Sequence, residues 1–392
     1  MAPAPNARAL PTDTAHAAAG AFRCAASPQD IAFMTPVTIL TGFLGSGKTT
    51  LLKRILTEAH GMKIAVIENE FGEENIDNDI LVQDNAEQIV QMSNGCICCT
   101  IRGDLVQALS DLNSQRDAGS IQFDRVVIET TGLANPGPVA QTFFIDDEVA
   151  DTYRLDAIIT LVDAKHGQQQ LDQHEVVQRQ VGFADRLFIT KADLVTPDAL
   201  DDLKHRLAHM NPRAPQQVVD FGQADLKQIF DIHGFNLNDK LDIDPDFLAA
   251  DEHAHDHGHD HDHDHSHCDH DHGKCDHEGH DHGHAHHHHH AHHDDAIKSF
   301  VFRSEKQFDP AKLEDFLGSI LQVYGERLLR YKGVLNMRGI DRRVVFQGVH
   351  QMMGSDVGTK WQPGETPNTK MVFIGAELPK DIILQGLERC LV

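Results

Sequence analysis

Short apolar runs alternate with helical patterns along the first part of the chain, from Val37 to about Asp244. The runs have the length of strands and span residues 37–40, 63–67, 125–128, 157–162 and 186–189. This alternation is typical of βαβ units and predicts an α/β domain with a mainly parallel sheet. Ligands of such sheets bind beyond the carboxyl ends of the strands, so the loops after the runs are expected to carry the function.

The pattern changes after this domain. Residues 251–295 form a low-complexity tract of His and Asp, and globular patterning resumes at Ile297. Strand-like runs at 298–302, 344–349 and 371–375, with helical patterns at 310–320 and 379–391, predict a smaller α+β domain. Residues 1–33 are rich in Ala and Pro, which predicts a disordered leader before Met34, a candidate second start of translation. The expected division is a leader at 1–33, a main domain at 34–250, a linker at 251–295 and a C-terminal domain at 296–392.

Composition narrows the classes of function. A net charge of -26 argues against nucleic acid or anionic membrane as a partner, because both are polyanions. Outside the tract the chain stays acidic, with 47 Asp and Glu against 33 Lys and Arg. No run of about eighteen apolar residues and no secretory signal is visible, which predicts a cytoplasmic protein. Seven cysteines, three of them within residues 96–99, favour metal or redox chemistry over structural disulfides.

The loop after the first run matches the phosphate-binding pattern G-x-x-x-x-G-K-[ST]. It comprises Gly42, Phe43, Leu44, Gly45, Ser46, Gly47, Lys48 and Thr49, and a helical run begins at Thr50, which we include in the nucleotide site. The glycines let consecutive backbone N–H groups wrap the phosphates. Lys48 is expected to reach the β- and γ-phosphates, and the Thr49 hydroxyl to ligate Mg²⁺.

A second motif follows the run at 125–128 and reads Glu129-Thr130-Thr131-Gly132. Glu129 is placed to act near Mg²⁺, and the Gly132 N–H is placed to meet the γ-phosphate. Asp is the usual acid here, so direct metal binding, binding through water and orientation of the attacking water all stay open. A solvated or helix-capping Glu is the alternative.

A third motif, Thr190-Lys191-Ala192-Asp193, resembles the guanine-recognition pattern Asn-Lys-x-Asp. A carboxylate at Asp193 can accept from both the N1–H and the exocyclic amine of guanine, and adenine has no such pair of donors. The motif therefore predicts GTP as the nucleotide, although Thr190 in place of Asn weakens the prediction. With the first two motifs it predicts a GTPase that uses Lys48, Thr49 and Glu129 in catalysis.

A thiol cluster and an acidic segment point to a transition metal. Cys96, Cys98 and Cys99 are soft ligands that select zinc, copper(I) or iron–sulfur over hard cations, and a further ligand must complete a four-coordinate site. Upstream, Glu68, Glu70 and Glu73 are candidate metal ligands or sensors of the γ-phosphate, and Glu68 and Glu70 share one strand face. Buried inert cysteines and a solvated acidic loop are the alternatives.

The motifs GFLGSGKTTLL, IENEFGE, NGCICC, VVIETTGLANPGP and TKADL occur in this order, and with them the chain resembles the CobW/YjiA family of metal-linked P-loop GTPases. The resemblance covers about residues 37–225, and LLRYKGVLN, VVFQGVH and MVFIGAELP resemble the second domain of that family. It implies that the thiol motif around Cys98 and the acidic stretch with Glu68 and Glu73 bind zinc or a similar ion. It also implies that the nucleotide state alters metal affinity. Family members differ in metal and client, and one branch serves cobalamin synthesis.

The His/Asp tract holds 21 of the 29 histidines together with Cys268 and Cys275. Imidazoles bind zinc, nickel and copper, so the tract predicts a reservoir of weakly held ions, and a linker that binds metal incidentally is the alternative. We expect a Mg²⁺-dependent GTPase that loads zinc, or Co²⁺ or Ni²⁺, in one nucleotide state and releases it to a client protein in the other. A nucleotide-dependent homodimer is a further candidate partner. The competing hypotheses are a metal buffer that uses the tract and a cobalt or nickel insertion factor.

Overall fold

A parallel sheet forms the centre of the main domain, as the alternating runs predict. The computed structural model describes residues 34–58, 61–68, 89–91, 101–219, 221–225, 229–235, 295–362 and 364–392. Within these residues the strand order is β3-β2-β4-β1-β5-β6-β7, and all neighbouring strands are parallel. The strands are β1 (Thr35–Gly42), β2 (Ile64–Glu68), β3 (Ile89–Gln91), β4 (Arg125–Glu129), β5 (Tyr153–Asp163), β6 (Arg186–Thr190) and β7 (Gln216–Val218).

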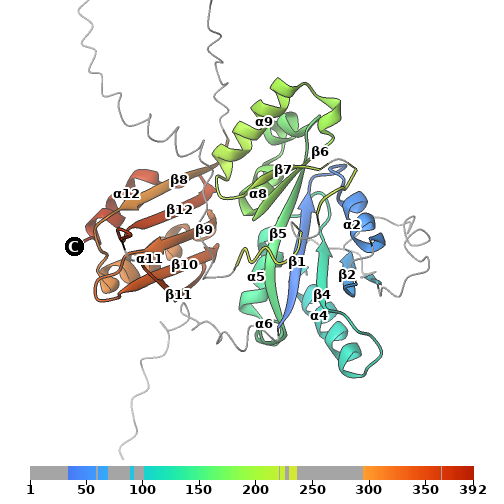
Figure 1. The fold of residues 1–392 in the computed structure, drawn as a ribbon, viewed down its shortest axis with the longest axis horizontal. Coiled ribbons are helices and arrows are strands. Elements are labelled where there is room, and N and C mark those ends of the chain that lie inside the picture. The colour runs from blue at the N-terminus through green and yellow to red at the C-terminus, as the bar shows by residue number, and fades with distance from the viewer. Residues whose placement is uncertain are drawn as a thin grey trace, which may run out of the picture.

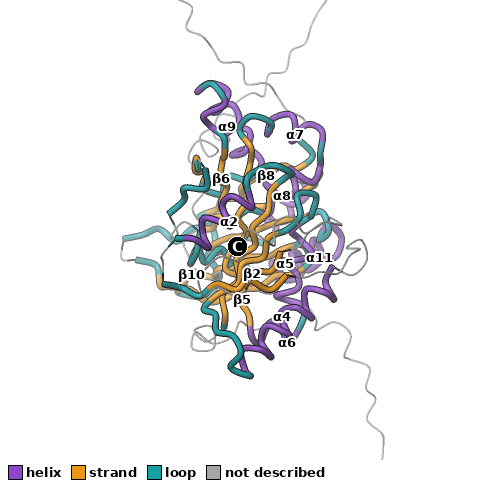
Figure 2. Tube along the Cα trace, turned by 90° about the vertical axis from the view of Figure 1, so that its right-hand side faces the viewer, coloured by secondary structure: helices purple, strands orange, loops and turns teal. Residues whose placement is uncertain are grey.

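Helices cover both faces of this sheet, which explains why its strands are almost continuously apolar. They are α2 (Lys48–Thr57), α4 (Ile101–Asp117), α5 (Pro136–Ile145), α6 (Asp147–Thr152), α7 (Gly167–Gln173), α8 (Glu175–Phe183) and α9 (Pro197–Met210), with a 3-10 turn at Ala192–Leu194. One face packs against α2 and the segment around Phe230. The other packs against α4, α5, α8 and α9. Figure 2 shows the strands in the middle of the molecule with helices around them.

The C-terminal part forms the predicted α+β domain, drawn in orange and red in Figure 1. Its antiparallel sheet has the order β11-β10-β9-β12-β8. The elements are β8 (Ile297–Ser304), α11 (Pro310–Tyr324), β9 (Leu328–Leu335), β10 (Arg342–Val349), β11 (Met352–Lys360), β12 (Thr369–Ala376) and α12 (Lys380–Arg389). Along β12, Met371 and Phe373 pack with the helices, while the alternate residues Val372 and Ile374 join the core of the main domain. Strand β12 is therefore packed on both faces of the sheet.

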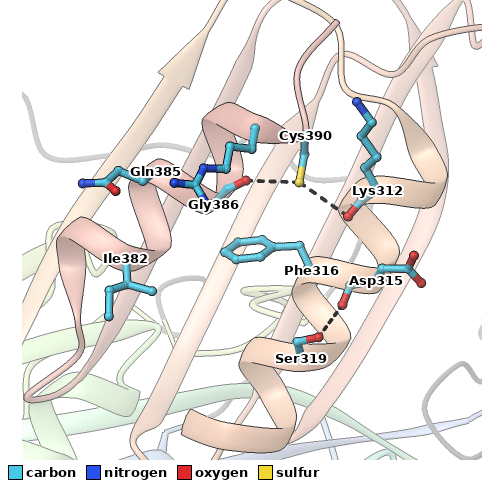
Figure 3. A pocket seen from close by; sticks show the side chains of 9 residues that line it. Lys312, Asp315, Phe316, Ser319, Ile382, Gln385, Gly386 and Cys390 are labelled. Carbon is cyan, nitrogen blue, oxygen red and sulfur yellow. Dashed lines mark hydrogen bonds between the residues drawn. The ribbon is translucent and has the colours of Figure 1, made fainter.

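A hollow of about 650 Å³ lies between α11 and α12 (Figure 3). Cys390 lies at this hollow, and its Sγ is 3.2 Å from the carbonyl oxygen of Gly386 and 3.4 Å from that of Lys312. Burial raises the pKa of the Cys390 thiol, which favours the protonated form that donates to these carbonyls. Cys390 is therefore a packing residue of this domain.

The two sheets meet through α8 and α9, which contact β8 and β9. Arg330 of β9 is completely buried at this interface, with one guanidinium nitrogen 3.2 Å from Asp185 Oδ1 and 2.7 Å from the Gly234 carbonyl oxygen. The guanidinium carbon also lies 3.6 Å from the centre of the Phe235 ring. Burial lowers the pKa of Arg330 to about 10, and the charge of Asp185 opposes that shift. A buried ion pair thus joins the two domains.

Candidate functional site

The phosphate-binding loop leaves the central strand β1 and enters α2. Gly42, the last residue of β1, has φ 142°, and a Cβ built on it would lie 2.4 Å from the carbonyl oxygen of Leu161. Gly45 and Gly47 also have positive φ values of 73° and 97°. Positive φ and close backbone approach are both accessible to glycine and strained for other residues. The glycines of the sequence pattern therefore set the shape of the loop.

The side chain of Lys48 folds back over this loop. Its Nζ donates to the carbonyl oxygen of Gly42 at 2.9 Å and to that of Phe43 at 3.1 Å. Burial lowers the pKa of Lys48, and the nearby carboxylate of Glu129 opposes that change. Of the other loop residues, Leu44 and Thr50 are exposed and Ser46 is buried.

Glu129 ends β4 and faces the start of α2. Its Oε1 accepts a hydrogen bond of 3.2 Å from the Thr49 hydroxyl, so the predicted Mg²⁺ ligand Thr49 lies next to the acid expected to act near Mg²⁺. Both groups offer oxygen donors, which hard cations such as Mg²⁺ prefer, and the phosphate loop lies beside them. This donor set fits Mg²⁺ bound with a nucleoside triphosphate.

Four neighbouring strands align their carboxyl ends next to this pair. In the sheet register Gln91 of β3 pairs with Glu68 of β2, Glu68 pairs with Glu129 of β4, and Glu129 pairs with Leu40 of β1. Glu68 is buried, as is Glu129. The predicted ligands Glu70, Glu73, Cys96, Cys98 and Cys99 lie outside the described residues. In the sequence, Glu70 and Glu73 come after β2, and the three cysteines come after β3.

The loop after Glu129 packs closely on the phosphate loop. The Thr130 hydroxyl donates to that of Thr41 at 2.8 Å, and a Cβ on Gly132 would lie 2.6 Å from the backbone nitrogen of Leu44. The Gln180 side chain of α8 donates to the carbonyl oxygens of Gly132 and Ala134 at 3.1 and 3.0 Å. Gly132 is thus held between Leu44 and Gln180.

The guanine-recognition motif follows β6 and joins the same site. The Thr190 hydroxyl donates to the Ser46 carbonyl oxygen at 2.9 Å, so the residue that replaces Asn ties this motif to the phosphate loop. Lys191 has a left-handed φ of 58°, and its Nζ lies 2.7 Å from Asp163 Oδ2. Asp193 is exposed.

Asp163 and Gln180 belong to this site, although no sequence motif indicated them. Asp163 ends β5 and accepts from Lys191, from the backbone N–H groups of Lys165 and His166, and pairs with the His166 ring. Burial alone would raise the pKa of Asp163, but these hydrogen bonds hold it below its usual range. The signal for Asp163 was its place at the end of an apolar run, as for Glu129. Gln180, inside a helix, gave no signal.

Comparison with known proteins shows which family the two domains match. The model of the CobW/HypB/UreG nucleotide-binding domain matches residues 36–218, and that of the cobalamin synthesis protein cobW C-terminal domain matches residues 297–391. Within the described residues, no helix is long and apolar enough to cross a membrane.

The chain is similar over most of its length to proteins that bear the name zinc chaperone. It is 40% identical over 349 residues to the zinc chaperone YjiA of Escherichia coli, covering 88% of this chain and 96% of the relative. It is 32% identical to the zinc chaperone CobW of Pseudomonas aeruginosa, covering 91% of each. The crystal structure of zinc-bound YjiA GTPase from E. coli superimposes with a TM-score of 0.70 at 36% identity, covering 92% of this chain and 99% of that one. The chain therefore belongs to the CobW/HypB/UreG family of P-loop GTPases.

Proposed function

We propose that this protein is a zinc chaperone that binds zinc through the thiol and acidic motifs and passes it to a client protein under the control of GTP. The observation that carries the proposal is the order of strands β3-β2-β4-β1. Because these strands pair in register, Glu68 of the acidic motif lies beside Glu129, and the thiol motif, which follows β3 in the chain, would start at the same edge of the sheet. The zinc-chaperone relatives support zinc as the cargo.

The nucleotide half of the proposal rests on Lys48, Thr49 and Glu129. Lys48 donates to the Gly42 and Phe43 carbonyl oxygens of its own loop, and phosphate oxygens would compete for that ammonium group. Thr49 and Glu129 would hold Mg²⁺, which neutralises charge on the β- and γ-phosphates when bound. Asp193 would select guanine, and Lys191, fixed by Asp163, would line the base site.

Coupling between the two halves follows from the neighbouring carboxylates Glu68 and Glu129. Both are buried and lie side by side on adjacent strands, so a cation bound at one changes the electrostatic field at the other. Loss of the γ-phosphate would release the loop at Gly132 and alter the position of this strand edge. Zinc affinity would then differ between the GTP and GDP states.

Two other functions make different predictions. A metal buffer would depend on the His/Asp tract, whereas the chaperone would keep high-affinity zinc binding and GTP hydrolysis without it. A cobalt or nickel insertion factor would bind its own metal in preference to zinc. The ligand types alone do not rank these metals. Competition of zinc with Co²⁺ and Ni²⁺ for the high-affinity site therefore distinguishes the insertion factor from the zinc chaperone.

The test measures zinc affinity by competition with a chelator, in the presence of GDP and of a non-hydrolysable GTP analogue. The full chain is compared with a variant that lacks residues 251–294 and keeps Asp295, because Arg206 binds that carboxylate at 2.6 Å. We expect the deletion to retain one tight site whose affinity differs by about fivefold or more between the nucleotide states. Cys98→Ser should abolish this site, and Cys24→Ser, outside the thiol motif and retained in the deletion, is the matched control. Equal zinc affinity in both nucleotide states would contradict the proposal.

A further inference from the structure

The short helix α8 (Glu175–Phe183) contacts both the nucleotide site and the C-terminal domain. It lies between the two sheets, and it touches β1 and β5 on one side and β8 and β9 on the other (Figure 1). His174 precedes its first residue, and the imidazole ring stacks on Phe43 of the phosphate loop with 4.7 Å between ring centres. A change in either domain therefore reaches this helix directly.

Gln180 is the residue of α8 that binds the loop after Glu129. It is fully buried, and its Nε2 donates to the carbonyl oxygens of both Gly132 and Ala134. Because two carbonyl oxygens face this end of the side chain, the amide must present its NH₂ group to them. Its Oε1 accepts no hydrogen bond from any described residue. Both hydrogen bonds of the Gln180 side chain in the structure are thus made to the Gly132–Ala134 loop.

The Gly132–Ala134 loop is also restrained by close contacts with the phosphate loop and with β1. Gly132 approaches the backbone of Leu44 so closely that a Cβ would lie 2.6 Å from the Leu44 nitrogen. Thr130 is tied to Thr41 of β1 by its hydroxyl and to Leu40 by its backbone. Gln180 therefore completes a three-sided support for the segment whose N–H group is expected to meet the γ-phosphate.

The C-terminal domain packs against the end of α8 that carries Gln180. A Cβ on Gly182 would lie 2.8 Å from a methyl carbon of Leu329 and 3.1 Å from one of Ile297. Phe183 makes an edge contact with the ring of His350, 5.1 Å between centres. His350 also lies against Gly137, at the start of the helix that follows the loop. The docking of the C-terminal domain thus fixes the position of Gln180.

We propose that Gln180 is a positioning residue for GTP hydrolysis, which holds the Gly132–Ala134 loop in the geometry that the γ-phosphate requires and makes that geometry depend on the C-terminal domain. The inference rests on the GTPase function and on the expected role of Gly132. The support acts through the loop backbone and leaves the binding of the other phosphates to Lys48 and the phosphate loop. Loss of Gln180 should therefore affect turnover more than nucleotide binding.

The experiment compares Gln180→Met and Gln178→Met in the full chain, by steady-state GTP hydrolysis and by GDP affinity. Methionine has nearly the length of glutamine and lacks the N–H donors. Gln178 is the control for burial and for contact with the C-terminal domain, because it lies on the same helix and is also buried. It donates to Leu171 and Asp295 and accepts from the Ile297 N–H, and it makes no hydrogen bond to the loop. For Gln180→Met we expect kcat to fall about tenfold or more, with KM and GDP affinity within about threefold of the wild type.

Thermal unfolding of both variants distinguishes positioning from a general loss of helix stability. If Gln180→Met does not fold, Gln180→Asn serves in its place, because it keeps an amide that is too short to reach both carbonyls and should lose part of kcat. A kcat loss in the Gln180 variants with little loss in Gln178→Met supports the proposal. Unchanged kcat in the Gln180 variants, or equal losses at both positions, would overturn it. A wild-type chain without GTPase activity would overturn the proposed function as well.

Discussion

The residues expected to carry the chemistry of this protein lie at the carboxyl ends of its strands. Glu129 ends β4, Asp163 ends β5 and Thr190 ends β6. The sequence predicted the first from its motif, and the same rule of position would have indicated Asp163. The roles of buried polar residues such as Gln180 were beyond sequence reasoning, because their partners are backbone carbonyls brought close by the fold.

Asp193 should decide the choice of base. Replacement by Ala removes two charge-assisted hydrogen bonds to guanine, so GTP affinity is expected to fall by about 30-fold or more while ATP binding stays weak and unchanged. Competition of GTP and ATP for a fluorescent nucleotide analogue measures this ratio. Asp198→Ala, at an exposed position on the next helix, is the control. An unchanged preference for GTP would show that another residue recognises the base.

At the scale of elements, the burial of each strand explains whether the sequence predicted it. The runs that became β1, β2, β4, β5 and β6 are apolar because helices cover both faces of their sheet. Strand β9 carries Arg330 and Lys332, both buried, and these two charges hid the strand in the sequence. Arg330 is paired with Asp185 at the domain interface. Strand β11 is a half-exposed edge strand with polar residues, and β3 and β7 have three residues each, so none gave a clear pattern.

The junction of β1 with the phosphate loop depends on a glycine at position 42. In Gly42→Ala the new methyl group would meet the carbonyl oxygen of Leu161 at 2.4 Å, in a backbone conformation that alanine rarely adopts. We expect the free energy of unfolding to fall by about 2 kcal/mol or more. Gly61→Ala, with φ 72° and no atom within 4 Å of the added carbon, should cost about 1 kcal/mol. Urea unfolding of the nucleotide-free chain measures both, and equal losses would refute the steric argument.

At the scale of the whole molecule, the two domains form one unit through a buried polar interface. Asp185 immediately precedes β6, which ends in the guanine-recognition motif, and it pairs with both Arg213 and Arg330. Asp295, the last residue of the His/Asp tract, is held by Arg206 of α9. Because the ion pairs and the α8 contacts lie between the sheets, a shift of the C-terminal domain changes the supports of the nucleotide site.

Breaking the buried pair should uncouple the domains at a large cost in stability. Arg330→Met leaves the Asp185 carboxylate buried with Arg213 as its remaining charged partner, and we expect a loss of about 3 kcal/mol in the free energy of unfolding. Arg327→Met breaks the exposed pair with Glu377 and should cost less than about 1 kcal/mol. Denaturant unfolding compares the two variants. Similar small losses would mean that the interface pair contributes little.

His350 should make the domain contact sensitive to acid. Burial lowers the pKa of this imidazole below its usual value. The folded state then binds fewer protons than the unfolded state, so the contribution to stability is complete above about pH 6.5 and declines as the pH falls below it. Urea unfolding of the zinc-free chain at about pH 7.5 and about pH 5.5 should show a smaller pH effect in His350→Asn than in the wild type. The exposed His205→Asn variant is the control, and equal pH effects in all three would contradict this assignment.

The central claim is that the nucleotide and zinc sites are coupled across the edge formed by β3, β2, β4 and β1. Thermodynamic linkage requires zinc to change the affinity for a non-hydrolysable GTP analogue by the same factor by which the analogue changes the affinity for zinc. The direct measurement uses the chain that lacks residues 251–294. It compares the dissociation constants of a fluorescent GTP analogue and of GDP, with and without one equivalent of zinc. We predict a change of about fivefold or more that disappears in Cys98→Ala. An affinity ratio that does not respond to zinc, or responds equally in Cys98→Ala, would contradict the account.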